Sequence, residues 1–233
     1  WKNLMSKELK KRIITSIILF LFTYITIFIN LYLSLLTLII ISVFCWLEFA
    51  KMIRKIYLNR KKFIAYLILI LSAIYLTIFA TISYYLIAFD KIYFLYLILI
   101  CAFSDIGGYV FGKIFKWKKL TKISPNKTIS GSIGSFIFSL IPYFIFKIIF
   151  LYSNIYLLAF TENLLFNILI SLFLSLVCQI GDLFISYFKR LSYFKDTGKI
   201  LPGHGGLLDR IDGIIFAIPC FVFVGYLLNF LNY

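Results

Sequence analysis

Long apolar runs separated by short polar segments dominate the chain. Runs of about 20 apolar residues are long enough to cross a bilayer as helices. The chain has seven such runs, at about 13–29, 32–50, 63–84, 92–112, 130–151, 164–187 and 212–231. The run from Phe63 to Phe89 is long for one helix, which suggests tilt or a break. The pattern predicts an all-α, polytopic bundle of about seven transmembrane helices.

Composition places the chain among integral membrane proteins. Hydrophobic residues make up 63% of it and charged residues 14%, whereas a soluble domain averages about 45–50% and about 25%. No polar segment is long enough to fold separately, so we expect a single membrane domain over residues 1–233. The four cysteines lie in apolar runs without a CxxC spacing, which favours small core residues over metal ligands or disulfides.

The basic residues predict the orientation of the helices. A net charge of +15 would suggest a nucleic-acid partner in a soluble protein, but Lys and Arg are also enriched in the cytoplasmic loops of membrane proteins. Five, six, six and five of the 24 basic residues lie in segments 1–12, 51–62, 113–127 and 189–210. If seven spans alternate, all four segments lie on one side. We therefore expect a cytoplasmic N-terminus and no nucleic-acid partner.

Polar and ionisable residues that could take part in catalysis concentrate in residues 181–213, which read GDLFISYFKRLSYFKDTGKILPGHGGLLDRIDG. This stretch holds four of the nine acidic residues and the only histidine. The spacing of Asp182, Ser186 and Lys189 places them on one face of a helix, and Asp209 and Asp212 share a face in the same way. Ionisable groups inside a membrane are costly and are functional candidates by default.

These residue types suit phosphate chemistry with a metal ion. Carboxylates are hard oxygen ligands for Mg²⁺, which commonly binds one or two of them together with substrate phosphates. Lysine and arginine neutralise phosphate charge, and glycine lets backbone N–H groups approach an anion. The stretch predicts metal-assisted nucleotidyl or phosphoryl transfer at a lipid–water boundary. The alternative is a cytoplasmic loop whose acids pair with its bases. The residues with these roles toward phosphate are the basic residues Lys189, Arg190 and Arg210 and the glycines Gly203, Gly205 and Gly206.

A second polar cluster lies between Ser104 and Gly134. Asp105 ends an apolar run there, and the glycines that follow it allow tight helix packing or a close ligand. Ser124, Lys127 and Thr128 belong to a turn before the next span and offer donors to phosphate. The alternative for this turn is a plain loop in which Ser or Thr caps the following helix.

The motifs resemble one known family. From Ser186 to Asp212 the chain fits S-x-F-K-R-x4-K-D-x-G-x2-L-P-x-H-G-G-L-x-D-R-I-D without a gap. This looks like the signature of CDP-diacylglycerol synthase, also called phosphatidate cytidylyltransferase, of the bacterial integral-membrane type. The second cluster is similar to that family's D-x-x-A-Y-x-x-G-like stretch and its S-P-x-K-T motif. The corresponding residues are Asp105, Tyr109, Gly112, Ser124, Pro125, Lys127 and Thr128.

The resemblance covers about the C-terminal 60% of the chain strongly. Residues 91–233 would form the catalytic part, with the signature at 186–212, and residues 1–90 would be variable N-terminal spans. In those spans only a W-x-E pattern at Trp46 and Glu48 echoes the family. There are two departures. Ser130 replaces the usual acidic or amide residue after K-T-x, and the N-terminal half looks shorter than usual.

The resemblance implies that CTP and phosphatidate react to give CDP-diacylglycerol and pyrophosphate. It implies Asp182 and Asp209 as ligands of Mg²⁺ or another hard divalent cation. The implied catalytic residues are Asp182, Lys189, Arg190, Asp209, Arg210 and Asp212. The implied substrate-binding residues are Asp105, Ser124, Lys127, Thr128, Ser186, His204, Gly205 and Gly206. Because the attacking phosphate is already an anion, His204 is not needed as a base; it could be a phosphate ligand or a structural donor.

Other functions fit the motifs less well. A CDP-alcohol phosphatidyltransferase would need D-G-x2-A-R-x8-G-x3-D-x3-D, and a CTP-dependent polyprenol kinase would lack the H-G-G-x-x-D-R-x-D block. A transporter or channel is the alternative from another class, but its charges would gather near the bilayer centre rather than at the cytoplasmic edge. We expect a protein of the bacterial cytoplasmic (inner) membrane, in contact with membrane lipids, with its active site facing the cytoplasm. The sequence does not decide whether the protein forms a homodimer.

Overall fold

The computed structural model describes residues 21, 23–57, 61–121, 123–153, 163–198, 200 and 205–231. The regular elements in these ranges are α-helices, and the β-type pairing there is an isolated bridge between Lys119 and Thr128. This confirms the predicted all-α class. The helices are α2 (Leu31–Tyr57), α3 (Lys62–Phe89), α4 (Lys91–Phe115), α5 (Ile129–Ser139), α6 (Ile141–Ser153), α7 (Leu164–Leu191) and α8 (Leu208–Leu231).

Six helical stretches in the described ranges are long and apolar enough to cross a membrane. They are α2, α3, α4, the α5–α6 stretch Ile129–Ile149, α7 and α8 up to Leu227. Each coincides with a span predicted from the hydrophobic pattern. Most of the other predicted span, 13–29, lies outside the described residues. The polytopic membrane architecture is therefore confirmed.

A helix break occurs at a place that the hydrophobic pattern did not indicate. The long run from Phe63 to Phe89 forms one unbroken helix, α3, which contains neither Gly nor Pro. The predicted span at 130–151 instead divides at Leu140 into α5 and α6. Pro142 has no N–H to donate to the preceding turn, but it is tolerated in the first turn of a new helix. Proline chemistry therefore accounts for the break.

The chain divides into two compact units, which are described separately below. Unit 1 comprises the described residues of Trp1–Lys91 and Phe188–Ile211, and unit 2 those of Ile92–Tyr187 and Asp212–Tyr233. Helices α7 and α8 each contribute to both units. The single membrane domain expected from the sequence stays a prediction.

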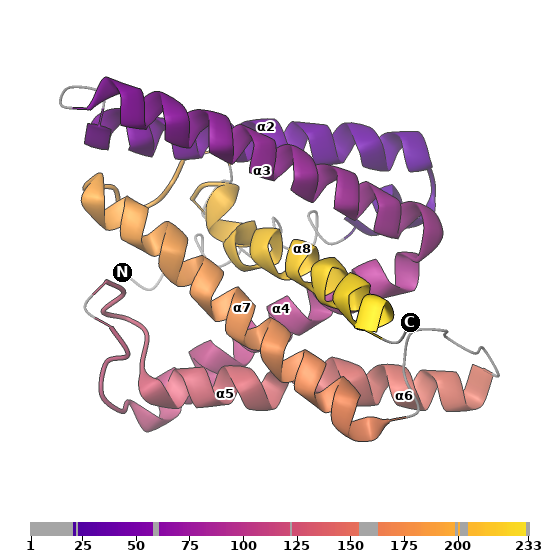
Figure 1. The fold of residues 1–233 in the computed structure, drawn as a ribbon. Helices are drawn as coiled ribbons and strands as arrows, with labels where there is room; N and C mark the ends of the chain where they lie inside the picture. The colour runs from indigo at the N-terminus through magenta and orange to yellow at the C-terminus, as the bar shows by residue number, and fades with distance from the viewer. Residues whose placement is uncertain are drawn as a thin grey trace, which may run out of the picture. The chain divides into compact units, whose positions relative to one another are not determined.

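In unit 1, α2 and α3 lie side by side (Figure 1). The indole Nε1 of Trp46 donates a hydrogen bond of 3.0 Å to the Leu69 carbonyl, which ties the two helices together. The C-terminal end of α7 also packs on α2. The rings of Phe49 and Phe188 meet edge to face at 5.2 Å, and the Lys55 ammonium lies 4.3 Å from the Phe194 ring centre. Two of the basic segments, 51–62 and 189–210, therefore meet in this unit.

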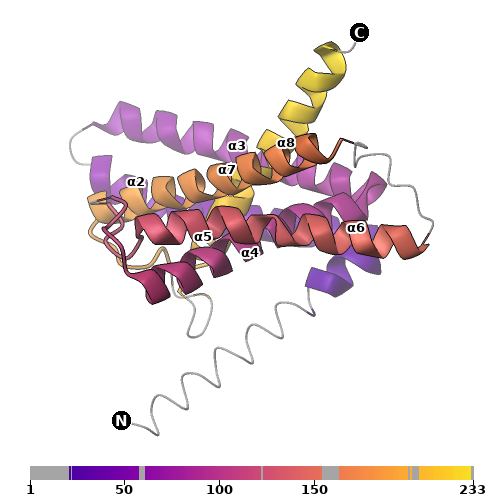
Figure 2. The ribbon, with the colours of Figure 1, turned by 90° about the horizontal axis from the view of Figure 1, so that it is seen from below.

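In unit 2, glycines bring α4 and α5 into close contact. A Cβ at Gly107 would overlap the backbone of Gly134, and one at Gly108 would press on the hydroxyl of Ser135. The packing role expected for the α4 glycines is confirmed, as small residues allow membrane helices to approach closely. Helices α5 and α6 continue end to end along one side of this unit (Figure 2).

Buried hydroxyl groups join α4 to α7 in the same unit. The Tyr96 hydroxyl lies 2.8 Å from that of Ser171, and the Ser104 hydroxyl lies 2.9 Å from that of Ser175. All four side chains are buried, and polar groups buried in a membrane protein need partners of this kind. These contacts fix the α7 face on which Asp182 lies, seven residues after Ser175.

Candidate functional site

Helix α7 presents the first residues of the signature. Along its last turns, Ser186 donates a hydrogen bond of 3.4 Å to Oδ1 of Asp182, which confirms that these two residues share a face. The helix ends with Tyr193 in the left-handed region, at φ 56°. The amides of Tyr193 and Phe194 donate back to the carbonyls of Arg190 and Lys189, at 3.1 and 2.9 Å. This Schellman-type end turns the chain away from the helix axis.

In unit 2, three carboxyl groups and one ammonium group gather. Lys127 forms an ion pair with Asp182 across 55 residues of sequence. The carboxyl group of Asp212, which is 8% exposed, accepts a hydrogen bond of 3.0 Å from the Gly213 amide. Asp182 and Asp105 are both near enough to act electrostatically on Asp212. Carboxylates that lie close together repel each other unless a proton or a cation lies between them. This cluster therefore favours positive charge.

The carboxylates of unit 2 suit a metal ion that takes most of its ligands from water and substrate phosphates. Among the described residues, no group of three or more His, Cys, Asp or Glu side chains has a geometry that could hold a metal ion. Mg²⁺, however, commonly binds proteins through only one or two carboxylates and takes its remaining ligands from water and substrate phosphates. Asp182 and Asp212 offer oxygen donors of that kind.

In unit 1, Asp209 is held by three donors. Lys189 donates to Oδ1 at 2.7 Å, and the backbone amides of Thr197 and Gly206 donate to Oδ2 at 2.8 and 3.2 Å. The Lys189 and Asp209 side chains are only 15% and 10% exposed. Asp209 lies in the first turn of α8, where the helix dipole also favours negative charge. Its position is thus set by the protein itself.

Glu48 is part of the same unit and was missed as a site residue from the sequence. Its carboxylate accepts hydrogen bonds from the Thr197 hydroxyl and from the amides of Leu207 and Leu208. Glu48 is 1% exposed. An acidic residue inside an apolar span is unusual enough to be a candidate. That signal was present in the sequence, but it could not show which partners Glu48 would meet.

The turn before α5 has the capping role that the sequence offered as the alternative to phosphate binding. Thr128 caps α5, because its hydroxyl accepts a hydrogen bond of 3.1 Å from the Gly131 amide. Ser130, the departure from the family pattern, is buried and lies 3.1 Å from the same hydroxyl. Lys127 instead forms an ion pair with Asp182. In this turn, the Thr128 hydroxyl is therefore structural, and the Lys127 ammonium group belongs to the carboxylate cluster. The predicted substrate contacts of Ser124 and Thr128 stay predictions.

Comparison with known proteins places the chain in a family. The profile of the cytidylyltransferase family matches residues 58–228, which is most of the chain and includes every signature residue. The chain belongs to the cytidylyltransferase family.

Several curated relatives come from staphylococci. Proteins named phosphatidate cytidylyltransferase from Staphylococcus haemolyticus and Staphylococcus aureus strain COL are 42% and 44% identical to the chain over 128 residues. One from Staphylococcus epidermidis is 43% identical over 129 residues. The matched segment is 54% of this chain and 46% of each relative. The chain therefore spans about half the length of the curated relatives it matches.

Of the remaining signature residues of this cytidylyltransferase-family chain, Gly205 lies beside Asp209. Gly205 has φ +83°, a conformation that favours glycine, and a Cβ there would lie 3.2 Å from Oδ2 of Asp209. Arg190 and Arg210 are exposed, and their predicted role toward phosphate stays a prediction. His204 lies outside the described residues, so its role stays open. Asp182 and Asp209, the predicted metal ligands, belong to different units.

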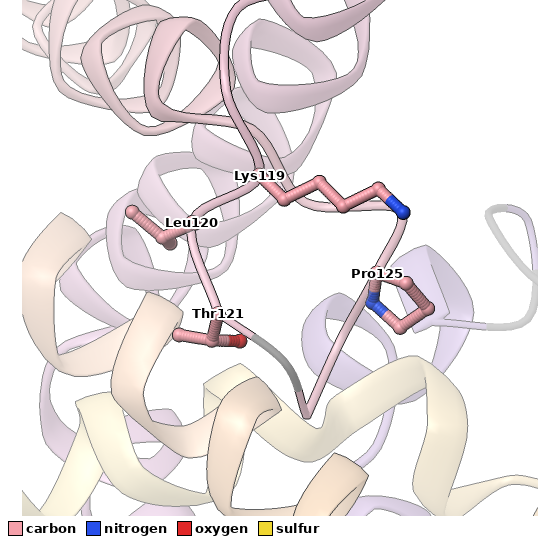
Figure 3. Close-up of a pocket in the computed structure, with 4 residues that line it drawn as sticks. All are labelled: Lys119, Leu120, Thr121 and Pro125. Atoms are coloured by element: carbon pink, nitrogen blue, oxygen red, sulfur yellow. The ribbon is translucent and has the colours of Figure 1, made fainter.

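A small hollow lies beside the turn in unit 2 (Figure 3). It has a volume of about 380 Å³ and is lined by Lys119, Leu120, Thr121 and Pro125. Backbone hydrogen bonds fold this segment back on itself: the Leu120 amide donates to the Lys127 carbonyl at 2.8 Å. Figure 3 shows the Lys119 side chain extended on the same side as Pro125. The hollow was not predicted from the sequence.

Proposed function

We propose that this cytidylyltransferase-family protein transfers the cytidylyl group of CTP to phosphatidate, which yields CDP-diacylglycerol and pyrophosphate. The observation that carries the proposal is the clustering of signature residues into two carboxylate–lysine groups, Lys127 with Asp182 and Lys189 with Asp209. Hard anionic oxygens beside ammonium groups suit a metal–nucleotide and its phosphates. The names of the curated relatives point to the same reaction.

The proposed reaction is a direct displacement at phosphorus. A phosphate oxygen of phosphatidate forms a bond to the α-phosphorus of CTP, while the bond from that phosphorus to the bridging oxygen breaks and pyrophosphate leaves. The nucleophile is already an anion, so no side chain has to remove a proton. Catalysis then depends on positioning and on neutralising charge, which reduces the repulsion between the two phosphates. We assign that neutralisation to Lys127, Lys189, Arg190 and Arg210.

We assign divalent-cation binding, with Mg²⁺ as the first candidate, to Asp182 in unit 2, where Asp212 supports it, and to Asp209 in unit 1. When bound, such an ion would polarise the phosphate oxygens and offset their negative charge. Asp182 would have to exchange its ion pair with Lys127 for a new partner, after which Lys127 would be available to a substrate phosphate. Asp209 would keep its two backbone donors, which hold the carboxylate in one orientation.

The membrane supplies one of the proposed substrates. Six apolar helical stretches place the chain in a bilayer, where phosphatidate is also dissolved. The basic segments 51–62, 113–127 and 189–210 would lie at the level of the lipid head groups, and the positive-inside rule assigns that side to the cytoplasm. CTP would then reach the lipid phosphate from the cytoplasm.

The proposal is tested by conversion of labelled CTP into lipid-soluble product in membranes that carry the protein. We expect product only when phosphatidate and Mg²⁺ are both present. We expect Asp209→Asn to lower the rate by at least about 100-fold, since an interaction used in the transition state is lost. Asp90→Asn is the matched control, because Asp90 is an exposed aspartate between α3 and α4, outside every motif. This control should retain the wild-type rate.

The proposal would be overturned if wild-type membranes made no CDP-lipid with Mg²⁺, Mn²⁺ or Co²⁺ while the protein was present and folded. Product that formed without phosphatidate would also contradict it, because the acceptor would then be another molecule. If Asp209→Asn retained full activity, Asp209 would not be a metal ligand or any other part of the site.

A further inference from the structure

A buried glutamate of α2 lies at the start of α8. Both carboxylate oxygens of Glu48 accept hydrogen bonds there. Oε2 accepts from the Thr197 hydroxyl at 2.8 Å and from the Leu208 amide at 2.9 Å, and Oε1 accepts from the Leu207 amide at 3.1 Å. Leu208 is the first residue of α8, where backbone amides have no partners within the helix. A residue 160 positions away in sequence thus supplies the cap that a local side chain usually provides.

The backbone of the signature segment comes very close to this carboxylate. A Cβ at Gly198 would overlap Oε1 of Glu48, and a Cβ at Gly206 would lie 2.6 Å from Oε2. Both positions therefore need glycine as long as Glu48 occupies its place. The close approach shows that Glu48 is enclosed by the segment, and not merely adjacent to it.

Thr197, which Glu48 holds, and Gly206, which lies against Glu48, both donate to Asp209. Thr197 gives its hydroxyl to Glu48 and its amide to Oδ2 of Asp209, at 2.8 Å in both cases. Gly206, which lies against Glu48, donates its amide to the same Oδ2. Two carboxylates thus hold the segment from two sides. A shift of Thr197 or Gly206 away from Glu48 would move the donors that orient Asp209.

Burial makes this arrangement costly unless every bond is made. A carboxylate removed from water is tolerated when hydrogen bonds replace its hydration, and bonds to a charged acceptor are the stronger ones. Glu48 satisfies this condition with three donors, two of them at the positive end of a helix. Anchoring the helix alone would require only the two amides. The additional bond to Thr197 connects the anchor to the Asp209 donors.

We propose that Glu48 is a positioning residue for Asp209: it holds Thr197, Gly206 and the start of α8 so that the Asp209 carboxylate keeps one orientation. The proposal rests on the proposed function for its kinetic consequence, but the structural link can be tested without activity. Glu48 does not touch the substrate in this account and acts only through the segment that it anchors.

The test uses variants at both ends of the Glu48–Thr197 bond. Glu48→Gln keeps the size of the side chain but turns an NH₂ group toward at least one of the three donors. Thr197→Val removes only the hydroxyl, and Thr197→Ser restores it. Trp46→Phe is the control on the same helix, because it removes the bond to Leu69 and leaves the segment untouched. For each purified variant, kcat, the KM for CTP and amide hydrogen exchange are measured.

For Glu48→Gln and Thr197→Val, we expect kcat to fall about 10-fold or more, with less than about a threefold change in KM. Amides 205–208 should exchange at least about 10 times faster, while α3 keeps its protection. Thr197→Ser should resemble the wild type, and Trp46→Phe should keep the wild-type kcat and the protection of amides 205–208. In an Asp209→Asn background, Glu48→Gln should lower the residual rate by less than about twofold, because its effect passes through Asp209.

Three outcomes would overturn the proposal. The first is a kcat for Glu48→Gln within twofold of the wild type. The second is faster exchange in α3 as well as at residues 205–208, which would indicate a general loss of the fold. The third is full additivity with Asp209→Asn. If the wild type itself makes no CDP-lipid, the proposed function fails; the exchange measurement then still decides whether Glu48 anchors the segment.

Discussion

The two carboxylate–lysine pairs differ in how their carboxylates are held. In unit 2, Lys127 and Asp182 are each about a quarter exposed, at 26% and 28%, and Lys127 comes from a turn. In unit 1, Lys189 and Asp209 are 15% and 10% exposed, and two backbone amides also donate to Asp209. One carboxylate is therefore paired with a partly solvated side chain, and the other is fixed by the backbone.

The difference indicates which pair can change partners when a substrate binds. A partly exposed ion pair contributes little to stability and can be replaced at small cost. A carboxylate held by backbone amides can reorient only if the backbone moves. We infer that the Lys127–Asp182 pair opens to admit substrate, while Asp209 stays in place. The predictions below test this contrast, from the largest expected effect to the smallest.

Loss of Lys189 should impair turnover. Lys189→Met removes the ammonium group 2.7 Å from Oδ1 of Asp209 and leaves a partly buried carboxylate with fewer donors. We expect kcat to fall about 100-fold with a smaller change in KM, since the group acts where charge develops. Steady-state kinetics with labelled CTP measure both constants. Lys189→Arg, which keeps the charge, is the control; equal loss in both variants would contradict the assigned role.

Loss of Lys127 should weaken binding more than turnover. In Lys127→Met, Asp182 loses its ion-pair partner, but a substrate complex can still bind to it. We expect the KM for CTP to rise about 10-fold and kcat to fall by a smaller factor. This pattern is typical of a lost interaction that stabilises the bound substrate and the transition state equally. Lys119→Met, a lysine of the same segment at the small hollow, is the control. A kcat effect as large as that of Lys189→Met would remove the distinction between the pairs.

Packing in unit 2 can be disturbed without touching either pair. In Gly134→Ala, the new methyl group would overlap the Phe111 side chain and the Gly107 carbonyl. Overpacking of this kind costs about 1–3 kcal/mol, so we expect a lower melting temperature in detergent with an unchanged KM for CTP. Gly225→Ala is the control, because a Cβ there meets no atom within 4 Å. A normal melting temperature for Gly134→Ala would show that α4 and α5 can separate freely.

A substitution at Tyr193, just after the end of α7, should have the smallest effect on stability. Tyr193 is 90% exposed and has φ 56°, a conformation that costs a non-glycine residue roughly 1 kcal/mol. Tyr193→Gly should therefore raise the melting temperature slightly and leave kcat unchanged. Tyr193→Ala keeps the backbone strain without the ring, and should show no gain. A gain in both variants would trace the effect to the tyrosine side chain.

Much of the fold followed from the hydrophobic pattern. Among the described residues, the six helical stretches long and apolar enough to cross a membrane lie where apolar runs predicted them, because length and hydropathy are local properties of the chain. The break at Leu140 was not predicted, since Pro142 lies inside a run that is apolar throughout. The glycines of α4 were correctly expected at a close helix contact.

The sequence singled out the candidate site residues, but it could not show their partners. Spacing placed Asp182 and Ser186 on one helix face, and the structure agrees. The pairing of Lys127 with Asp182 could not be chosen from 24 basic residues without the fold. Glu48 was noted only as a weak resemblance, because its role depends on Leu208, 160 residues away. Contacts between distant segments are what the sequence alone leaves undetermined.

The central claim, that both carboxylates are needed but are held differently, is tested most directly by comparing Asp182→Asn with Asp209→Asn. Turnover of labelled CTP and melting temperature would be measured on the same preparations. Both variants should lose at least about 100-fold in kcat. Only Asp209→Asn should also melt earlier, by an amount equivalent to about 2 kcal/mol, because its NH₂ group must face either Lys189 or the two backbone amides. Equal melting temperatures, or full activity in either variant, would contradict the account.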